Sequence, residues 1–372
     1  MKKAVLSLFL VLTLLVTLIG CSTPQTASNA TTEQPAAQET PAKSEAPAEV
    51  KDLKVGFVIS SLHEPIFKAY QDYLKKAVTD AGTEAGYNVS FTCVSSDLDI
   101  AKESANVRDM LAAGSNVIIL NTIDSKACLA TIEEAHKAGA KVVMFCREAD
   151  PEASGIQKPD VTINMDSYDQ AYTSLKRTLE YMKEDGVEPV DMISCMGYML
   201  DQNAINRQNG VQDVCMEEGI AIKQIVSCGV WEPEVTLANL TAALQANPNC
   251  NLIYAPSDSQ LSGVQKALER AGKWAPRGDK KHVYLAGTDV FPEGYKLLAL
   301  KYEEASTENP VWPCAVKTAE SIVKLMKGET IESDGFIKVK GRVYDQDNYH
   351  TFDYTWAKDY STEDLSQYDP KK

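Results

Sequence analysis

The chain has 372 residues, of which 44% are hydrophobic, and a formal net charge of −15 at pH 7. So acidic a sequence, without a basic cluster, argues against nucleic acid and anionic lipid as partners, because both bind clustered Lys and Arg. The length that remains after residue 50 exceeds what one hydrophobic core usually supports, so two domains are expected.

The N-terminus has the pattern of an export signal. Lys2 and Lys3 precede an apolar run over residues 4–19, which is shorter than the roughly 20 residues that a membrane-spanning helix needs. The run ends in Leu-Ile-Gly-Cys at Cys21, which resembles the lipobox of bacterial lipoproteins. This resemblance implies that the signal peptide, residues 1–20, is removed and that Cys21 is acylated. The alternative is an ordinary secretory signal with an incidental cysteine.

Residues 21–50 are expected to form a lipidated cysteine and a disordered tether. The segment consists mainly of Ser, Thr, Pro, Ala, Gln and Glu, and it cannot bury enough apolar surface to offset the entropy of ordering it. Stable membrane attachment needs more than one acyl chain, which a lipoprotein anchor supplies. The expected location is therefore the extracytoplasmic face of a cell membrane. A tethered protein of this kind suggests a Gram-positive source, and a Gram-negative lipoprotein stays open.

From residue 54 onward, apolar strand patterns alternate with amphipathic helix patterns. Strands are predicted at 55–60, 89–94, 117–121, 141–145, 161–164, 190–195, 221–227, 252–254, 283–286 and 304–307. Helices are predicted at 65–81, 100–113, 125–138, 168–183, 201–218, 233–245, 259–271, 292–300 and 310–327. This βαβ alternation predicts parallel sheets covered on both faces. A polar break at 148–160 favours two sheets over one wide sheet. Short β-like stretches are expected after Gly335, and the polar C-terminal residues are expected to be frayed.

The cysteines and histidines do not have the spacing of a metal site. Besides Cys21 there are eight cysteines without a CxxC pair, and the four histidines are scattered, so no metal and no cofactor are expected. An extracytoplasmic location permits disulfides. Several of these cysteines lie inside apolar strands or helices, however, and we interpret them mainly as buried free thiols.

Six short segments resemble, in order and spacing, the type I periplasmic sugar-binding proteins of the ribose/galactose group. They are the loop Ser60-Ser61-Leu62-His63-Glu64-Pro65-Ile66-Phe67, the helix segment Ala105-Asn106-Val107-Arg108-Asp109-Met110, and the strand ends Val117-Ile118-Ile119-Leu120-Asn121, Val142-Val143-Met144-Phe145-Cys146-Arg147, Tyr254-Ala255-Pro256-Ser257-Asp258 and Ala286-Gly287-Thr288-Asp289. The resemblance extends over about residues 54–349.

The resemblance implies an α/β protein with two Rossmann-like, doubly wound lobes, which are joined by a hinge of three crossings and enclose a ligand cleft. The crossings are expected near 164–166, 308–309 and 340–343. One lobe would then comprise 51–164 plus 309–340, and the other 165–308 plus 341–360. A monomer is expected.

The candidate site residues lie mostly at or just after the carboxyl ends of predicted strands, where parallel sheets bind ligands. Sugar hydroxyls need carboxylate, amide or guanidinium partners, and sugar C–H faces need apolar or aromatic plates. The resemblance then implies a ligand-binding set made of Glu64, Phe67, Arg147, Arg207, Trp231, Asp258, Asp289 and Glu308.

The candidates have roles in the resemblance, in which Asp289 is a cleft acceptor, and all except Asp289 also have a structural alternative. Arg147 would donate hydrogen bonds to two ligand hydroxyls. The rings of Phe67 and Trp231 would stack on opposite faces of the ligand. The alternatives are solvated charges for Glu64, Arg147 and Arg207, core or domain packing for Phe67 and Trp231, a helix cap for Asp258 and a hinge partner for Glu308.

Three departures from the family pattern leave the ligand open. Glu64 stands where these sugar binders usually have Asn or Asp, Cys146 where they have Asp, and Ser257 where they often have Asn. Ribose or glucose therefore cannot be carried over. Another sugar, a polyol or a modified aldose is plausible, and nucleosides or furanones stay open.

The expected function is that of a lipid-anchored solute-binding protein, which captures a small sugar or polyol and delivers it to the permease of an ABC importer. The alternative is a ligand-sensing component for a membrane histidine kinase or a chemoreceptor. Enzymatic activity is not expected, because no catalytic motif occurs and the acidic pairs Asp97/Asp99 and Asp289/Glu308 lack a nucleophile or metal.

Overall fold

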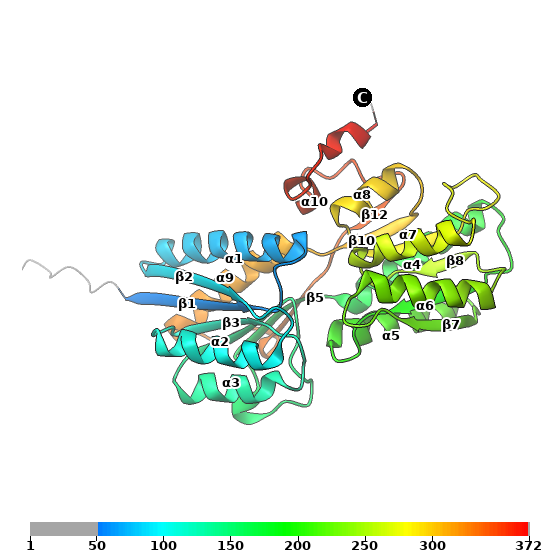
Figure 1. Cartoon of the computed structure of the whole chain (residues 1–372). Helices are drawn as coiled ribbons and strands as arrows, with labels where there is room; N and C mark the ends of the chain where they lie inside the picture. The colour runs from blue at the N-terminus through cyan, green and yellow to red at the C-terminus, as the bar shows by residue number, and fades with distance from the viewer. Residues whose placement is uncertain (1–50, 371–372) are drawn as a thin grey trace, which may run out of the picture. The chain divides into compact units, whose positions relative to one another are not determined.

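Two six-stranded sheets organise residues 51–370, which is the part of the chain that the computed structural model describes (Figure 1). The expected signal peptide, the acylation site at Cys21 and the tether lie outside the described residues. Within 51–370, none of the helices combines the length and the apolar character that crossing a membrane requires.

The first sheet is parallel throughout and has the strand order β11-β5-β4-β3-β1-β2. Its strands are β1 (Asp52–Ile59), β2 (Asn88–Ser95), β3 (Val117–Asn121), β4 (Lys141–Phe145), β5 (Val161–Met165) and β11 (Phe336–Val339). Helices α1 (Pro65–Glu84) and α9 (Val311–Lys327) cover one face, and α2 (Ile100–Ala112) and α3 (Cys128–Lys137) cover the other. Alternate residues along a strand point to opposite faces: Phe57 packs toward α1, whereas Val58 packs toward α2. We call this sheet and its helices the first lobe.

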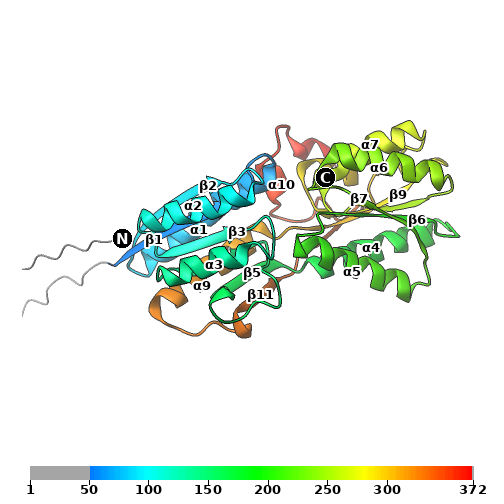
Figure 2. The same cartoon turned by 60° about the horizontal axis from the view of Figure 1, so that its bottom comes forward.

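The second sheet has the order β12-β10-β9-β8-β6-β7, and only β12 in it runs antiparallel. Its strands are β6 (Met192–Met196), β7 (Ile222–Ser227), β8 (Leu252–Tyr254), β9 (Tyr284–Asp289), β10 (Ala305–Glu308) and β12 (Val343–Asp345). Helices α4 (Ser167–Glu184) and α5 (Gln202–Glu217) lie on one face, and α6 (Pro233–Ala246) and α7 (Leu261–Arg270) on the other (Figure 2). Together with α8 (Pro292–Ala299), they form the second lobe.

The chain passes between the two sheets three times. The crossings follow β5, β10 and β11, because each of these strands is succeeded by an element of the other lobe. This arrangement confirms the predicted fold of two doubly wound lobes joined by three crossings. The exact domain limits expected from the sequence stay a prediction.

The predicted strands and helices agree closely with the structure, and the C-terminus is the main correction. The polar residues after Phe352 were expected to be frayed. They form α10 (Trp356–Asp359) and a 3-10 helix at Leu365–Tyr368, because Trp356 and Leu365 are buried. The eight cysteines of the described residues are free and, apart from the partly buried Cys93, buried, as the interpretation of free thiols expected.

The packing of α1 on the first sheet provides a direct test of the lobe's core. Leu74 on α1 is fully buried, so Leu74→Ala should lower the free energy of unfolding by about 2–5 kcal/mol, since it removes apolar contacts and leaves a cavity. Urea denaturation measures this. Leu300→Ala, at an exposed side chain, is the control and should change stability by less than about 1 kcal/mol. Equal effects of the two changes would contradict the described packing.

Candidate functional site

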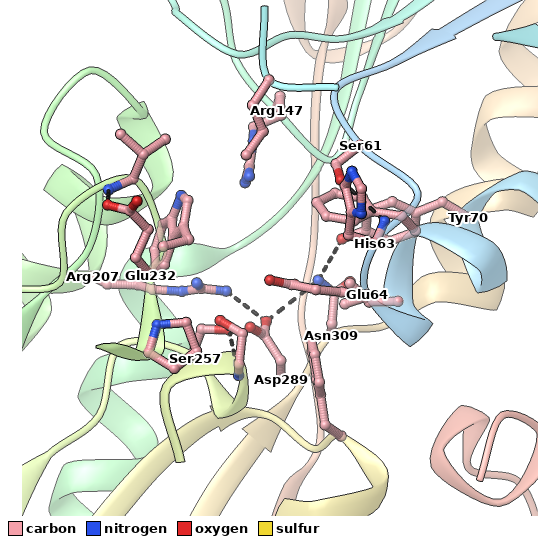
Figure 3. A pocket seen from close by; sticks show the side chains of 18 of the residues that line it. Ser61, His63, Glu64, Tyr70, Arg147, Arg207, Glu232, Ser257, Asp289 and Asn309 are labelled. Atoms are coloured by element: carbon pink, nitrogen blue, oxygen red, sulfur yellow. Dashed lines mark hydrogen bonds and ion pairs between the residues drawn. The ribbon is translucent and has the colours of Figure 1, made fainter. Parts of the chain in front are cut away.

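A cavity of about 410 Å³ lies where the carboxyl ends of strands from both lobes meet (Figure 3). Its walls come from the β1–α1 loop and the start of α1, the ends of β4 and β5, helix α5, the β7–α6 loop, the segment after β8, the turn after β9 and the crossing after β10. Parallel sheets place their binding sites at these ends. The cavity is therefore the main candidate for a ligand site.

An ion pair between Arg207 and Asp289 lies at the base of the cavity. Arg207 Nη2 lies 2.6 Å from Asp289 Oδ1, and both side chains are about 95% buried. The guanidinium also donates to the Pro256 carbonyl at 2.8 Å and to Gln170 Oε1 at 2.9 Å. Asn309 Nδ2 donates to the Tyr70 hydroxyl at 2.7 Å, and it lies 3.4 Å from Asp289 Oδ1. One carboxylate thus connects segments from both lobes (Figure 3).

The backbone around Asp289 is strained. Asp289 and Val290 have φ values of 96° and 54°, a left-handed conformation that is unfavourable for residues other than glycine. The Asp289 carbonyl accepts hydrogen bonds from Asn309 N at 3.1 Å and from Trp356 Nε1 at 3.2 Å. These two donors help to hold the turn that presents the Asp289 side chain.

Arg147 joins the two lobes across the cavity. It follows Cys146, whose positive φ of 51° turns the chain at the end of β4. Arg147 Nη1 lies 2.9 Å from Asp201 Oδ2 at the start of α5, and Asn203 Nδ2 donates to the Cys146 carbonyl at 3.1 Å. The guanidinium is therefore held by a buried carboxylate of the second lobe while it lines the cavity.

Glu64 brings a partly buried carboxyl group to the wall formed by the β1–α1 loop. The pKa of Glu64 is raised to about 7, mainly by burial and also by the nearby Asp289 carboxylate, while Arg147 opposes the shift. Near neutral pH this group can accept a hydrogen bond as a carboxylate or donate one as an acid.

Aromatic side chains supply the apolar surfaces of the cavity. The Trp231 indole lies directly against Gly197, where an added Cβ would come within 2.1 Å of Trp231 Cη2. Phe67, Tyr70 and Phe291 line the cavity as well, and the rings of Phe67 and Tyr70 meet edge to face at 6.0 Å. Within the described residues the buried Trp231 Nε1 has no hydrogen-bond partner.

Six of the eight candidate residues line this cavity, namely Glu64, Phe67, Arg147, Arg207, Trp231 and Asp289. The other two do not. Asp258 is buried behind the wall, where its Oδ2 accepts from Phe291 N at 2.7 Å. Burial raises its pKa first, and Asp289 adds to the effect. This carboxyl group supports the turn after β9 instead of capping a helix.

Glu308 lies at the second crossing and pairs with Arg342. The Arg342 guanidinium donates to the two carboxylate oxygens of Glu308 at 2.6 and 2.8 Å, and the pair belongs to a separate cavity of about 280 Å³. This geometry corresponds to the hinge alternative for Glu308, and the ligand contact expected of it stays a prediction.

Several residues of the cavity wall were not predicted from the sequence, and Tyr70 and Asn309 make the most contacts among them. Tyr70 lies one helical turn after Phe67, and that spacing could have revealed a shared face. Asn309 directly follows β10, at the carboxyl end of a parallel strand. His63, Glu232 and Ser257 also line the cavity. In residues 51–370 no group of three or more His, Cys, Asp or Glu is placed to hold a metal ion.

Comparisons with known proteins agree with this geometry. Residues 55–330 match the family model described as periplasmic binding protein domain. The ribose import binding protein of Salmonella typhimurium is 26% identical over 281 residues, which cover 75% of this chain and 86% of that protein.

Two solved structures share the fold. An ABC transporter solute binding protein from Mycobacterium smegmatis with bound glycerol is 20% identical with a TM-score of 0.69, covering 81% of this chain and 96% of that one. One from Bacillus halodurans with bound myo-inositol is 16% identical with a TM-score of 0.68, covering 82% of this chain and 98% of that one. At such identities the likeness carries the fold alone.

The raised pKa of Glu64 predicts how stability changes with pH. The folded protein holds this proton up to about pH 7, whereas the ordinary value is 4.5. The folded state therefore binds more protons between these values, and the free energy of unfolding should fall as the pH rises from 4.5 to 7. Allowing for partial exposure of the side chain, the loss should be about 2 kcal/mol.

Glu64→Gln should flatten this part of the profile, because the amide mimics the neutral acid. Thermal unfolding at a series of pH values measures it. The pKa of Glu103 is also raised to about 7, mainly by burial. Glu103 therefore leaves a residual slope of stability against pH in the wild type and in Glu64→Gln. Glu329→Gln, at an exposed position, is the matched control. Parallel profiles for the wild type and Glu64→Gln would show that Glu64 titrates normally.

Proposed function

Because this chain belongs to the periplasmic binding protein domain family, a family of binding proteins and not of enzymes, we propose that it captures a small sugar or polyol and delivers it to an ABC importer. The observation that carries the proposal is the cavity itself, in which Trp231 and Phe67 offer apolar faces beside the polar groups of Asp289, Arg147 and Glu64. Polyhydroxylated rings need both kinds of partner. The ligands named for the relatives, ribose, glycerol and myo-inositol, are of this class.

The charges on the wall favour a neutral ligand. The two arginines of the cavity are each paired with a carboxylate, Arg207 with Asp289 and Arg147 with Asp201. Glu64 and Glu232 add further carboxyl groups. An acidic sugar or a sugar phosphate would have to break one of these ion pairs or approach like charges, which is costly in a partly desolvated site.

Ligand capture would proceed by closure of the lobes. The ion pair Arg147–Asp201 and the hydrogen bond from Asn203 to Cys146 join the lobes at the cavity. A ligand that contacts both walls binds the closed arrangement more tightly than the open one and shifts the population toward it. In this proposal the two moving bodies comprise 51–164 with 309–340, and 165–308 with 341–360.

The proposal includes a lipid anchor on the extracytoplasmic side. Its support is the sequence alone: the lysines and apolar run before Cys21, and the polar composition of residues 22–50. An acylated Cys21 would keep the binding protein within reach of its permease, since the tether can span tens of ångströms.

A titration with neutral and acidic sugars tests the proposed function. D-ribose, D-allose, myo-inositol and glycerol should be screened by thermal shift and then by calorimetry. At 100 times its Kd, a true ligand stabilises the folded protein by about 2.7 kcal/mol. The corresponding uronic acid or sugar phosphate should bind at least about tenfold more weakly, because the arginines are already paired.

Trp231→Ala should weaken binding of the neutral ligand about tenfold or more, because it removes the aromatic surface on which the C–H face of a sugar packs.

Two further variants distinguish the loss of the Trp231 aromatic surface from a general destabilisation of the fold. Gly197→Ala should reproduce the loss, because the new Cβ displaces the indole. Trp274→Ala should retain the affinity, since Trp274 stacks on Tyr302 and is absent from the cavity wall. A screen in which no neutral sugar or polyol shifts the melting temperature would refute the proposed ligand class, and unchanged binding by Trp231→Ala would refute the site.

The lipid anchor has its own test. Expressed in a bacterium fed an alkyne-tagged fatty acid, the wild type should carry the label and partition into detergent. Cys21→Ser should lose both properties, because the acylated thiol is absent. Cys93→Ser, at a free cysteine in β2, is the control and should stay labelled. A labelled Cys21→Ser variant, or an unlabelled wild type, would exclude anchoring at this residue.

A further inference from the structure

The segment after β12, residues 346–370, lies outside the range that matches the family, 55–330, and yet it is well packed. We call it the C-terminal tail. Figure 1 shows its helix α10 beside α8 of the second lobe. The tail contacts both lobes and the wall of the cavity, and these three sets of contacts together suggest a role in binding.

The tail is anchored on the second lobe. Ala357 and Leu365 are buried in one apolar cluster with Tyr295 and Leu298 of α8. The Tyr349 hydroxyl donates to the Tyr368 carbonyl at 2.6 Å, which closes the tail on itself. These contacts fix the position of α10 relative to the second sheet.

The opposite side of the tail contacts α1 of the first lobe. The Tyr73 hydroxyl donates to Asp359 Oδ2 at 2.5 Å, and the Tyr360 hydroxyl donates to Asp72 Oδ2 at 3.1 Å. The Tyr73 and Tyr360 rings meet edge to face at 5.7 Å. The first turns of the same helix carry Phe67 and Tyr70 into the cavity.

The third set of contacts reaches the strained turn of the cavity wall. Trp356 is 1% exposed, and its Nε1 donates to the Asp289 carbonyl at 3.2 Å. Its ring packs edge to face against Phe291 with centroids 5.2 Å apart. Because Asp289 and Val290 have positive φ values, this turn depends on outside donors to keep its shape.

Building on the binding function proposed above, we propose that the C-terminal tail is part of the ligand-binding apparatus: Trp356 is a positioning residue for Asp289 and Phe291, and Asp359 and Tyr360 connect this wall to α1. The indole does not line the cavity itself. It acts through the carbonyl of the residue whose side chain does. Closure of the lobes and the shape of the wall are then linked through one segment.

Hydrogen exchange of the ligand-free protein tests the positioning role without any ligand. Trp356→Phe retains an aromatic ring against Phe291 but removes the donor to Asp289. Peptides that contain Phe291 and Asn309 should exchange about three- to tenfold faster, the factor expected for one lost hydrogen bond. Trp274→Phe, a matched change in the second lobe, should leave these peptides unchanged. Exchange at wild-type rates in Trp356→Phe would overturn the positioning role.

A double-mutant cycle in ligand affinity separates positioning from general destabilisation. The probe is whichever of D-ribose, D-allose, myo-inositol or glycerol binds the wild type. Trp356→Phe should weaken its binding three- to tenfold, and this effect should disappear in the Asp289→Asn background, because the two residues act as one unit. Additive effects would mean that Trp356 only contributes stability. If the wild type binds none of these compounds, the proposed ligand class fails, while the exchange result still decides the role of the tail.

The connection to α1 has a separate variant. Tyr73→Phe removes the donor to Asp359 and retains the ring, and it should raise exchange in peptides from the first turns of α1 about threefold or more. Tyr172→Phe is the matched control, because Tyr172 makes an equivalent bond to Glu217 at 2.7 Å on α4 and α5. If the two variants show the same exchange in α1, the tail does not restrain this helix.

Discussion

The buried ion pair between Arg207 and Asp289 is the interaction around which the cavity is assembled. Removing two charges from water is costly, and only close geometry with further hydrogen bonds compensates for it. Arg207 has that geometry through Gln170 and the Pro256 carbonyl, and Asp289 has it through Asn309. Losing one partner would leave an uncompensated buried charge, so the pair and the segments that hold it depend on one another.

The same electrostatic arrangement supports the proposal that the cavity binds a neutral ligand. A free arginine is a strong site for carboxylate or phosphate, but the two arginines of this cavity already face Asp201 and Asp289. They still have unused N–H donors at fixed angles for hydroxyl oxygens. Glu64, with its pKa near 7, can act as donor or acceptor. In the proposed function, directional hydrogen bonding therefore contributes more to recognition than net charge does.

The sequence predicted the fold well because the relevant signals are local. Apolar runs such as Val117–Asn121 and amphipathic helices such as Pro65–Glu84 are visible within one segment. Six of the eight residues that the resemblance implied line the cavity, and their contact with a ligand stays a prediction. Asp258 and Glu308 stand at equivalent ends and yet turn away from the cavity, because their partners, Phe291 N and Arg342, lie 33 and 34 residues further along the chain. Strand position alone does not show which neighbour a carboxylate will meet.

The C-terminal tail illustrates the same limit more strongly. Its composition is polar, and its few apolar residues have no clear period. The local sequence pattern therefore predicts a frayed end. Trp356 is nevertheless buried because its partners, Asp289 and Phe291, come from the turn after β9. That turn has three supports from three separate segments: Asp258 accepts from Phe291 N, and Asn309 N and Trp356 Nε1 donate to the Asp289 carbonyl. A wall preorganised in this way does not have to become ordered when the ligand arrives, so more of the contact energy is available for closing the lobes.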